Sequence, residues 1–166
     1  MIKAPSKVDC YYIVEMLKSN LIDYRYTQPW ADRIIERMQQ PPTWLFDISM
    51  ECDQEKQISV CCTVAYGEPF NDTPSDLDKF HMACLWVRYE QSNLSWADLL
   101  IELVGYLDGF NVGWPCEVPY HYLNLYEAAL SSEEAESETK RAYLSEQNVM
   151  PWVRLVYQKL KMFSIS

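Results

Sequence analysis

The sequence predicts an all-α fold, a single domain over residues 1–166 with about seven to nine antiparallel helices packed as stacked helical hairpins. Three observations predict it. Apolar residues recur at helical spacing along most of the chain, and helix start and stop signals separate the periodic segments. Only four glycines are present among 166 residues, which disfavours a turn-rich all-β fold. A chain of this length can bury an independent core.

Five segments carry the helical pattern most clearly. In each, apolar residues return three or four positions apart, so that one face of the helix must be buried against another element. These segments are residues 10–21, 77–87, 96–107, 118–129 and 152–163.

Prolines, glycines and small polar residues set the expected boundaries. Pro29 marks the start of one helix, because a missing N–H costs little in the first turn. The pair Pro41-Pro42 ends that helix and begins another. Ser95 with Asp98 three residues later resembles a capping box. Residues 105–115, which contain three of the four glycines, are expected to form an ordered loop.

Residues 57–66 fit two patterns. Apolar side chains alternate strictly from Ile58 to Tyr66, as in a strand, but Ile58, Cys61, Cys62 and Ala65 also fit a helix. No other segment makes a convincing partner strand, and a lone strand leaves its backbone groups unpaired. We therefore expect a helix here.

Acidic residues are concentrated in the middle of the chain. Residues 68–138 contain fourteen Asp or Glu and two bases, whereas residues 1–67 contain nine acids and seven bases, and residues 139–166 one acid and five bases. The middle segment is therefore the source of the net charge of -10. A surface of one sign attracts cations and repels nucleic acid, so we expect a basic protein partner and no nucleic-acid binding.

The leading hypothesis is a non-enzymatic protein that docks a basic partner through residues 68–138. Carboxylates would steer the approach, and two aromatic residues in predicted loop would anchor it, because Tyr and Trp are enriched at binding hot spots. The expected steering residues are Glu102, Asp108, Glu117, Glu133, Glu134 and Glu136, and the expected anchors are Trp114 and Tyr120. Two other interpretations stay open: a solvated acidic face that keeps the protein soluble, and a helical scaffold without such a partner.

An enzyme of a different class is the alternative. Asp76, Asp78 and His81 lie on a predicted helix that starts near Ser75, and an Asp and a His at this spacing can share a helix face. The alternative is a metal-dependent or carboxylate-based hydrolase, although metal sites need three or more protein ligands. We expect no cofactor, because no phosphate-binding glycine motif is present.

Several further expectations concern location. Residues 1–10 contain no apolar signal-peptide core, and no apolar stretch is long enough for a membrane span. We therefore expect a cytoplasmic protein with reduced thiols and no membrane contact. The six cysteines show no CxxC pair, so they are expected mainly to fill the core. The oligomeric state stays open.

Part of the N-terminal half resembles a known group of proteins. The matching stretches are residues 21–23, Trp30–Ile35 and Pro41–Ser49. Over about residues 10–50, they resemble small, uncharacterised, mostly helical bacterial proteins, some of which look like immunity proteins of secreted-toxin systems. The resemblance implies an all-α bacterial cytosolic protein and, for the immunity-like members, neutralisation of a toxin. It carries no catalytic residue.

Overall fold

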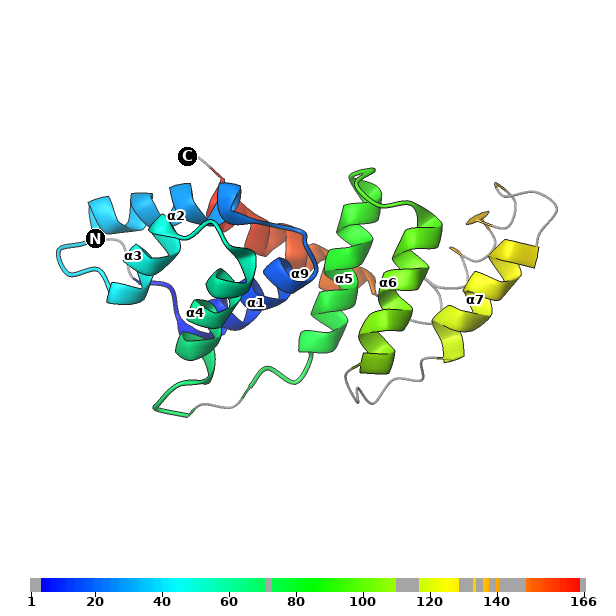
Figure 1. The fold of residues 1–166 in the computed structure, drawn as a ribbon, viewed down its shortest axis with the longest axis horizontal. Coiled ribbons are helices and arrows are strands. Elements are labelled where there is room, and N and C mark those ends of the chain that lie inside the picture. Colours follow the sequence, from blue (N-terminus) through cyan, green and yellow to red (C-terminus); the bar gives the residue numbers. More distant parts are fainter. Residues whose placement is uncertain are drawn as a thin grey trace. The chain divides into compact units, whose positions relative to one another are not determined.

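The computed structural model describes residues 4–70, 73–109, 117–128, 133, 136, 137, 140 and 149–164. Every regular element in these ranges is a helix, which confirms the predicted all-α class (Figure 1). The chain divides into two compact units, residues 1–81 with 155–166 (unit 1) and residues 82–154 (unit 2). We describe each unit by itself, and a single domain over the whole chain stays a prediction.

Eight α-helices have described bounds, which agrees with the expected seven to nine. They are α1 (Lys7–Lys18), α2 (Tyr24–Arg37), α3 (Thr43–Met50), α4 (Gln54–Tyr66), α5 (Leu77–Glu90), α6 (Trp96–Gly109), α7 (Glu117–Ala128) and α9 (Met150–Leu160), with a 3-10 helix η1 at Lys161–Phe163. The division between the units falls within α5 and α9. No helix in the described ranges is both long enough and apolar enough to cross a bilayer.

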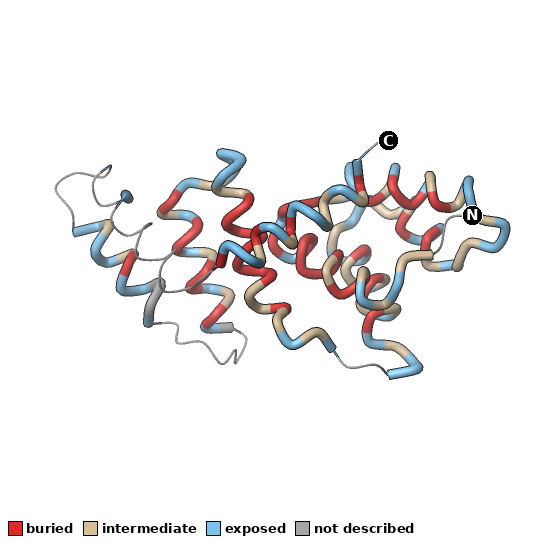
Figure 2. Tube along the Cα trace, turned by 180° about the vertical axis from the view of Figure 1, so that it is seen from behind, coloured by how far each residue is buried: buried red, intermediate tan, exposed pale blue. Residues whose placement is uncertain are grey.

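Helices α1 and α4 pack together in unit 1. Ile13, Val14 and Leu17 of α1 are fully buried, and Figure 2 shows the alternation of buried and exposed positions along the helices. On α4, Cys61 and Ala65 are buried one turn apart. The alternating stretch is therefore a helix, as predicted, because burial follows the helical period instead of every second residue.

Helix α2 begins earlier than predicted. The Asp23 carboxylate accepts a hydrogen bond from the Arg25 N–H at 2.9 Å and acts as the N-cap, so Pro29 lies inside the helix and not at its start. Pro29 has no N–H to give to the Arg25 carbonyl, yet the helix continues to Arg37. The Pro41-Pro42 break is confirmed, because α3 starts directly after Pro42.

The C-terminal segment of unit 1 is attached to its N-terminal helices. The Lys159 ammonium lies 2.9 Å from the Asp9 carboxylate and 4.7 Å from the centre of the Tyr12 ring. Arg33 of α2 donates a hydrogen bond to the Phe163 carbonyl at 3.2 Å. Residues from both ends of the chain therefore complete one core.

In unit 2, α6 packs against α7. The Ser95 hydroxyl accepts a hydrogen bond from the Asp98 N–H at 3.1 Å, as the predicted cap of α6 requires. Leu100 and Leu103 are fully buried, and Tyr122 of α7 is 4% exposed. The predicted loop is wrong for residues 105–109, which continue α6, because this apolar stretch buries Leu107. The rest of that predicted loop, residues 110–116, lies outside the described residues.

The cysteines follow the core-filling expectation in part. Cys10, Cys61 and Cys84 are buried, whereas Cys52 is exposed and Cys62 is half-buried. Cys116 lies outside the described residues. Burial raises the pKa of Cys10 to about 12, with a smaller contribution from the Asp9 charge. It also raises the pKa of Cys61. Thiols with such high pKa values are poor nucleophiles, since the thiolate is the reactive form.

Candidate functional site

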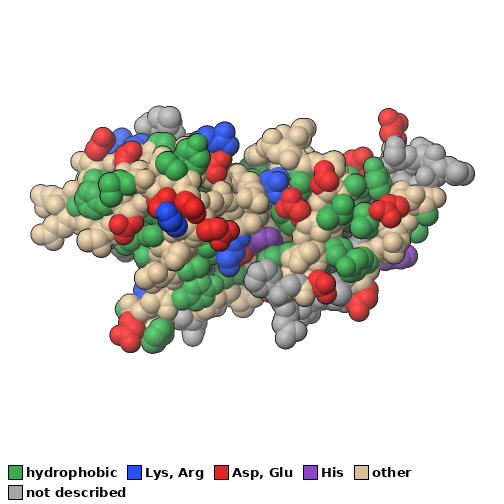
Figure 3. All heavy atoms as spheres, in the orientation of Figure 1, with side chains coloured by type: hydrophobic (Ala, Val, Ile, Leu, Met, Phe, Trp, Pro, Cys, Tyr) green, Lys and Arg blue, Asp and Glu red, His purple; other side chains and the backbone are tan. Residues whose placement is uncertain are grey.

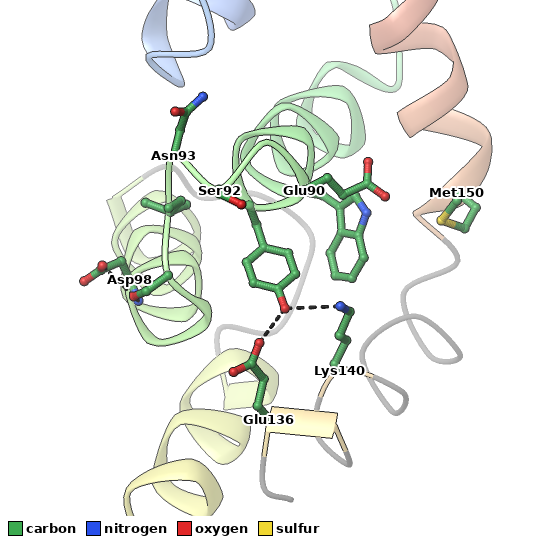
Figure 4. Close-up of a pocket in the computed structure, with 11 residues that line it drawn as sticks. Glu90, Ser92, Asn93, Asp98, Glu136, Lys140 and Met150 are labelled. Carbon is green, nitrogen blue, oxygen red and sulfur yellow. Dashed lines mark hydrogen bonds between the residues drawn. The ribbon is translucent and has the colours of Figure 1, made fainter. Parts of the chain in front are cut away.

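A pocket of about 1010 Å³ opens in unit 2 where α5 turns into α6. The end of α5, the connecting turn and the start of α6 contribute most of its lining, and three later residues complete it (Figure 4). The lining residues are Trp86, Tyr89, Glu90, Ser92, Asn93, Leu94, Ser95, Asp98, Glu136, Lys140 and Met150. All of them belong to unit 2.

The turn after α5 places the end of that helix at the pocket. The N–H groups of Ser92 and Asn93 donate to the carbonyls of Tyr89 and Arg88, each at 2.9 Å. Ser92 has a φ of 59°, in the left-handed region that commonly ends a helix. Trp86, Tyr89 and Glu90 are three and four residues apart, so they share one helix face.

Two aromatic rings, Trp86 and Tyr89, line the pocket, and a third, Trp96, packs against them. The centres of the Trp86 and Tyr89 rings are 5.5 Å apart. Trp96 lies behind them, 6.1 Å from Trp86 and 5.5 Å from Tyr89, and meets both edge-to-face. Trp86 and Trp96 are each 2% exposed. Edge-to-face packing of this kind holds the rings in place.

A lysine and a glutamate meet at the Tyr89 hydroxyl. Lys140 donates a hydrogen bond to this oxygen at 3.1 Å, and the hydroxyl in turn donates to the Glu136 carboxylate; both bonds are drawn in Figure 4. The Lys140 nitrogen also lies 4.7 Å from the centre of the Tyr89 ring and 5.7 Å from that of Trp86. These are cation–π distances.

The electrostatics of this site are set by burial and by the two charged neighbours of Tyr89. Burial raises the pKa of Tyr89, and the hydrogen bond to Glu136 raises it further, while Lys140 lowers it by a smaller amount. The phenol is therefore kept in its neutral form, able to donate one hydrogen bond and accept another.

The lining is suited to holding a cation. Its charged side chains are three carboxylates, from Glu90, Asp98 and Glu136, and one ammonium, from Lys140. Among the described lining residues none is a histidine or cysteine, the side chains that most often serve as general base or nucleophile. The charged lining residues carry more negative than positive charge.

The predicted site residues are distributed over unit 2. Glu136 lies in the pocket, while Asp108, Glu117 and Glu133 are exposed. Tyr120 is 43% exposed. As an anchor it was expected in loop, but it lies on α7, which begins at Glu117 and follows the helical pattern predicted over residues 118–129. Two predicted residues, Trp114 and Glu134, lie outside the described residues.

Glu102 differs from the other predicted carboxylates. It pairs with Arg88 of α5 at 2.7 Å, and its side chain is 37% exposed whereas that of Arg88 is 14% exposed. Its charge is therefore partly neutralised by a base of the same acidic segment.

His81 lies in the core of unit 1. Its Nδ1 atom is 3.0 Å from the Glu15 carboxylate, and the two residues are 5% and 4% exposed. Glu15 also pairs with Lys18 at 3.5 Å. This carboxylate belongs to α1, and the hydrolase alternative, with its site near Asp76, Asp78 and His81, stays a prediction. Within the described residues, no three His, Cys, Asp or Glu side chains gather as a metal site.

Sequence reasoning missed Trp86, Tyr89 and Lys140. One signal was available: Glu136 and Lys140 are four residues apart in the order that favours pairing on a helix. The contact of both residues with Tyr89, which lies about fifty positions earlier, could not be read from any local pattern. It depends on the tertiary fold.

The carboxylates of unit 2 do not form one continuous patch on the face drawn in Figure 3. Over α6 and α7, the acidic groups stand apart, with apolar and other side chains between them. A charge effect at this surface must therefore act through the summed field of separate groups. No protein-family model, curated protein or solved structure matches the chain.

Proposed function

We propose that the chain binds a basic protein through unit 2, without catalysing a reaction. The observation that carries the proposal is the division of charge between the units. Unit 2 contains eleven acids and four bases, a net charge of -7, whereas unit 1 contains thirteen acids and ten bases, a net charge of -3. Such a field raises the rate of encounter with a positively charged partner.

The exposed face of α7 supplies contacts of the required kind. Tyr120 and Leu125 are 43% and 47% exposed, and the exposed carboxylates of Glu117 and Glu127 lie on the same helix. Apolar anchors with a polar surround are typical of binding hot spots. A toxin domain is the most concrete partner, and this identity comes from the resemblance over residues 10–50.

A capture experiment with matched charge reversals tests the proposal. The tagged full chain, its Glu117→Lys/Glu127→Lys variant and a Glu36→Lys/Asp47→Lys variant are used to capture proteins from the lysate of the cells that produce the chain. The second pair changes the charge equally but lies on exposed positions of unit 1. We expect a basic protein that is retained by the control pair and lost by the α7 pair.

The salt dependence of association is the second measurement. Charge steering predicts that the association rate with the captured protein falls steeply as ionic strength rises, because salt screens exposed charges. Equal rates at low and high salt, or equal capture by the two double variants, would show that the acidic surface of unit 2 does not direct binding.

A further inference from the structure

We propose that the pocket wall formed by Trp86, Tyr89 and Glu136 is a receptor for a basic side chain, the tip of an arginine or lysine, and that Lys140 is its internal occupant. This inference rests on the proposed function in one respect only: the basic partner protein is the molecule that would present the side chain. The receptor itself is argued from the pocket geometry.

The first step is that the wall already holds an alkyl ammonium group. Lys140 is 4.7 Å from the Tyr89 ring centre and 5.7 Å from the Trp86 ring centre, and it donates to the Tyr89 hydroxyl at 3.1 Å. Aromatic faces attract cations through the ring quadrupole. The Glu136 carboxylate accepts a hydrogen bond from the same Tyr89 hydroxyl, so the ammonium lies over two rings whose phenol is joined to an acid.

The second step is that the occupied wall lines a larger space. The pocket measures about 1010 Å³, which is the size of a site for a small molecule or for several side chains. Glu90 and Asp98 add two carboxylates to the lining beyond Glu136. A second cation entering the pocket therefore meets more negative than positive charge, and it can take the place of Lys140 over the rings.

The third step is the preference among cations. A guanidinium group is planar, stacks on aromatic faces and can donate to a carboxylate and a hydroxyl at once. Arginine therefore matches a wall of two rings, one phenol and one carboxylate better than an ammonium does. We expect arginine to displace Lys140 more readily than lysine does.

The test uses a single side chain as the probe. Nα-acetyl-arginine amide carries its charge only on the guanidinium, and Nα-acetyl-citrulline amide is its uncharged analogue of the same shape. Binding to the full chain is followed by NMR and by tryptophan fluorescence. In the free protein, the side-chain methylene protons of Lys140, assigned with Lys140→Gln, should be shifted upfield by the rings. Saturation with the arginine probe should return them toward the values of an exposed lysine.

Variants separate displacement from general electrostatics. Lys140→Gln removes the internal occupant and should bind the arginine probe about two- to thirty-fold more tightly than the wild type, the range expected from losing one competing cation–π contact. Lys161→Gln makes the same charge change at an exposed position of unit 1 and should leave the affinity unchanged. Adding Glu136→Gln or Tyr89→Leu to Lys140→Gln should weaken binding, while Tyr89→Phe, which keeps the ring, should retain part of it.

The outcomes distinguish this inference from the proposed function. If Lys140→Gln binds arginine and citrulline probes alike, or no better than Lys161→Gln does, the receptor does not exist, whatever partner is captured through α7. If the probe binds and displaces Lys140 but no basic protein is captured in a salt-dependent way, the receptor stands and the proposed function fails. Circular dichroism of each variant confirms that the helices are retained.

Discussion

Replacement of either member of the buried Glu15–His81 pair should destabilise unit 1, and the double replacement should cost less than the sum. The two side chains are each 6% exposed and meet at 3.0 Å. His81→Leu leaves the Glu15 carboxylate buried with Lys18 as an ion-pair partner, at 3.5 Å and itself 34% exposed. Leaving a buried polar group without a hydrogen-bond partner costs about 1–3 kcal/mol, and more if the group is charged. We therefore expect a cost of about 3 kcal/mol.

Glu15→Leu should be milder. It removes the buried carboxyl group and leaves an imidazole that has lost one hydrogen-bond partner, a loss of about 1–3 kcal/mol. In the double variant, both polar groups are replaced by apolar side chains, which is often neutral in a buried site. We therefore expect the double variant to lose at least about 1 kcal/mol less unfolding free energy than the two single variants lose in total. This difference lies within the range of coupling energies between contacting residues.

The assay is urea unfolding at 25 °C, followed by far-UV circular dichroism and by tryptophan fluorescence, to which Trp30 and Trp44 of unit 1 contribute. Glu36→Leu, an exposed carboxylate on α2, is the control and should change the free energy of unfolding by less than about 0.5 kcal/mol. Additive costs in the double variant, or a His81→Leu cost as small as the control's, would refute the view that the pair is coupled in the core.

Three other predictions follow from the local structure. Asp9→Asn should cost about 1–2 kcal/mol, because it removes the ion pair with Lys159 and the acidic half of a helix cap. Burial raises the pKa of Asp9, but the hydrogen bonds it accepts outweigh this and hold the pKa below its ordinary value. The stability that ionised Asp9 contributes is therefore full above its unfolded pKa of about 4 and is lost as the pH falls through its lower folded pKa. The urea midpoints of the wild type and of Asp9→Asn should converge in acid. A difference between these midpoints that stays constant with pH would contradict this. Ser92→Gly should raise the free energy of unfolding by up to about 1 kcal/mol, since glycine adopts positive φ without strain, whereas Ser92→Ala should not; thermal unfolding of both checks this. Iodoacetamide with mass spectrometry should label Cys52 rapidly in the native protein and Cys61 only after unfolding; rapid labelling of both would contradict the raised thiol pKa.

The helices could be predicted where burial follows the sequence pattern. The apolar stripe of α1 is the buried stripe in the structure, and the Pro41-Pro42 break falls where α2 and α3 separate. The predicted start of α2 was wrong because Asp23, whose short side chain caps a helix well, outweighs Pro29 as a start signal. The sequence offered two start signals for this helix, a capping side chain at Asp23 and a proline at position 29. It did not show which of them sets the first residue.

The polar core could not be predicted. Thr27 and Gln57 are both fully buried and joined by a hydrogen bond of 2.8 Å, and Glu15 looks in the sequence like an exposed position of α1. Each of these side chains is satisfied by a partner at least thirty residues away. The same holds for Tyr89 and Lys140 in the pocket, so the candidate site depended on long-range pairing that periodicity does not encode.

The discontinuous make-up of unit 1 has a consequence for biosynthesis. Lys159, beside Asp9 and Tyr12, and Phe163, whose carbonyl accepts from Arg33, are translated after all of residues 82–154. On the ribosome, the first four helices must therefore wait for the last few residues before their core can close. A chain truncated before residue 155 would lack these contacts and would expose apolar surface of unit 1.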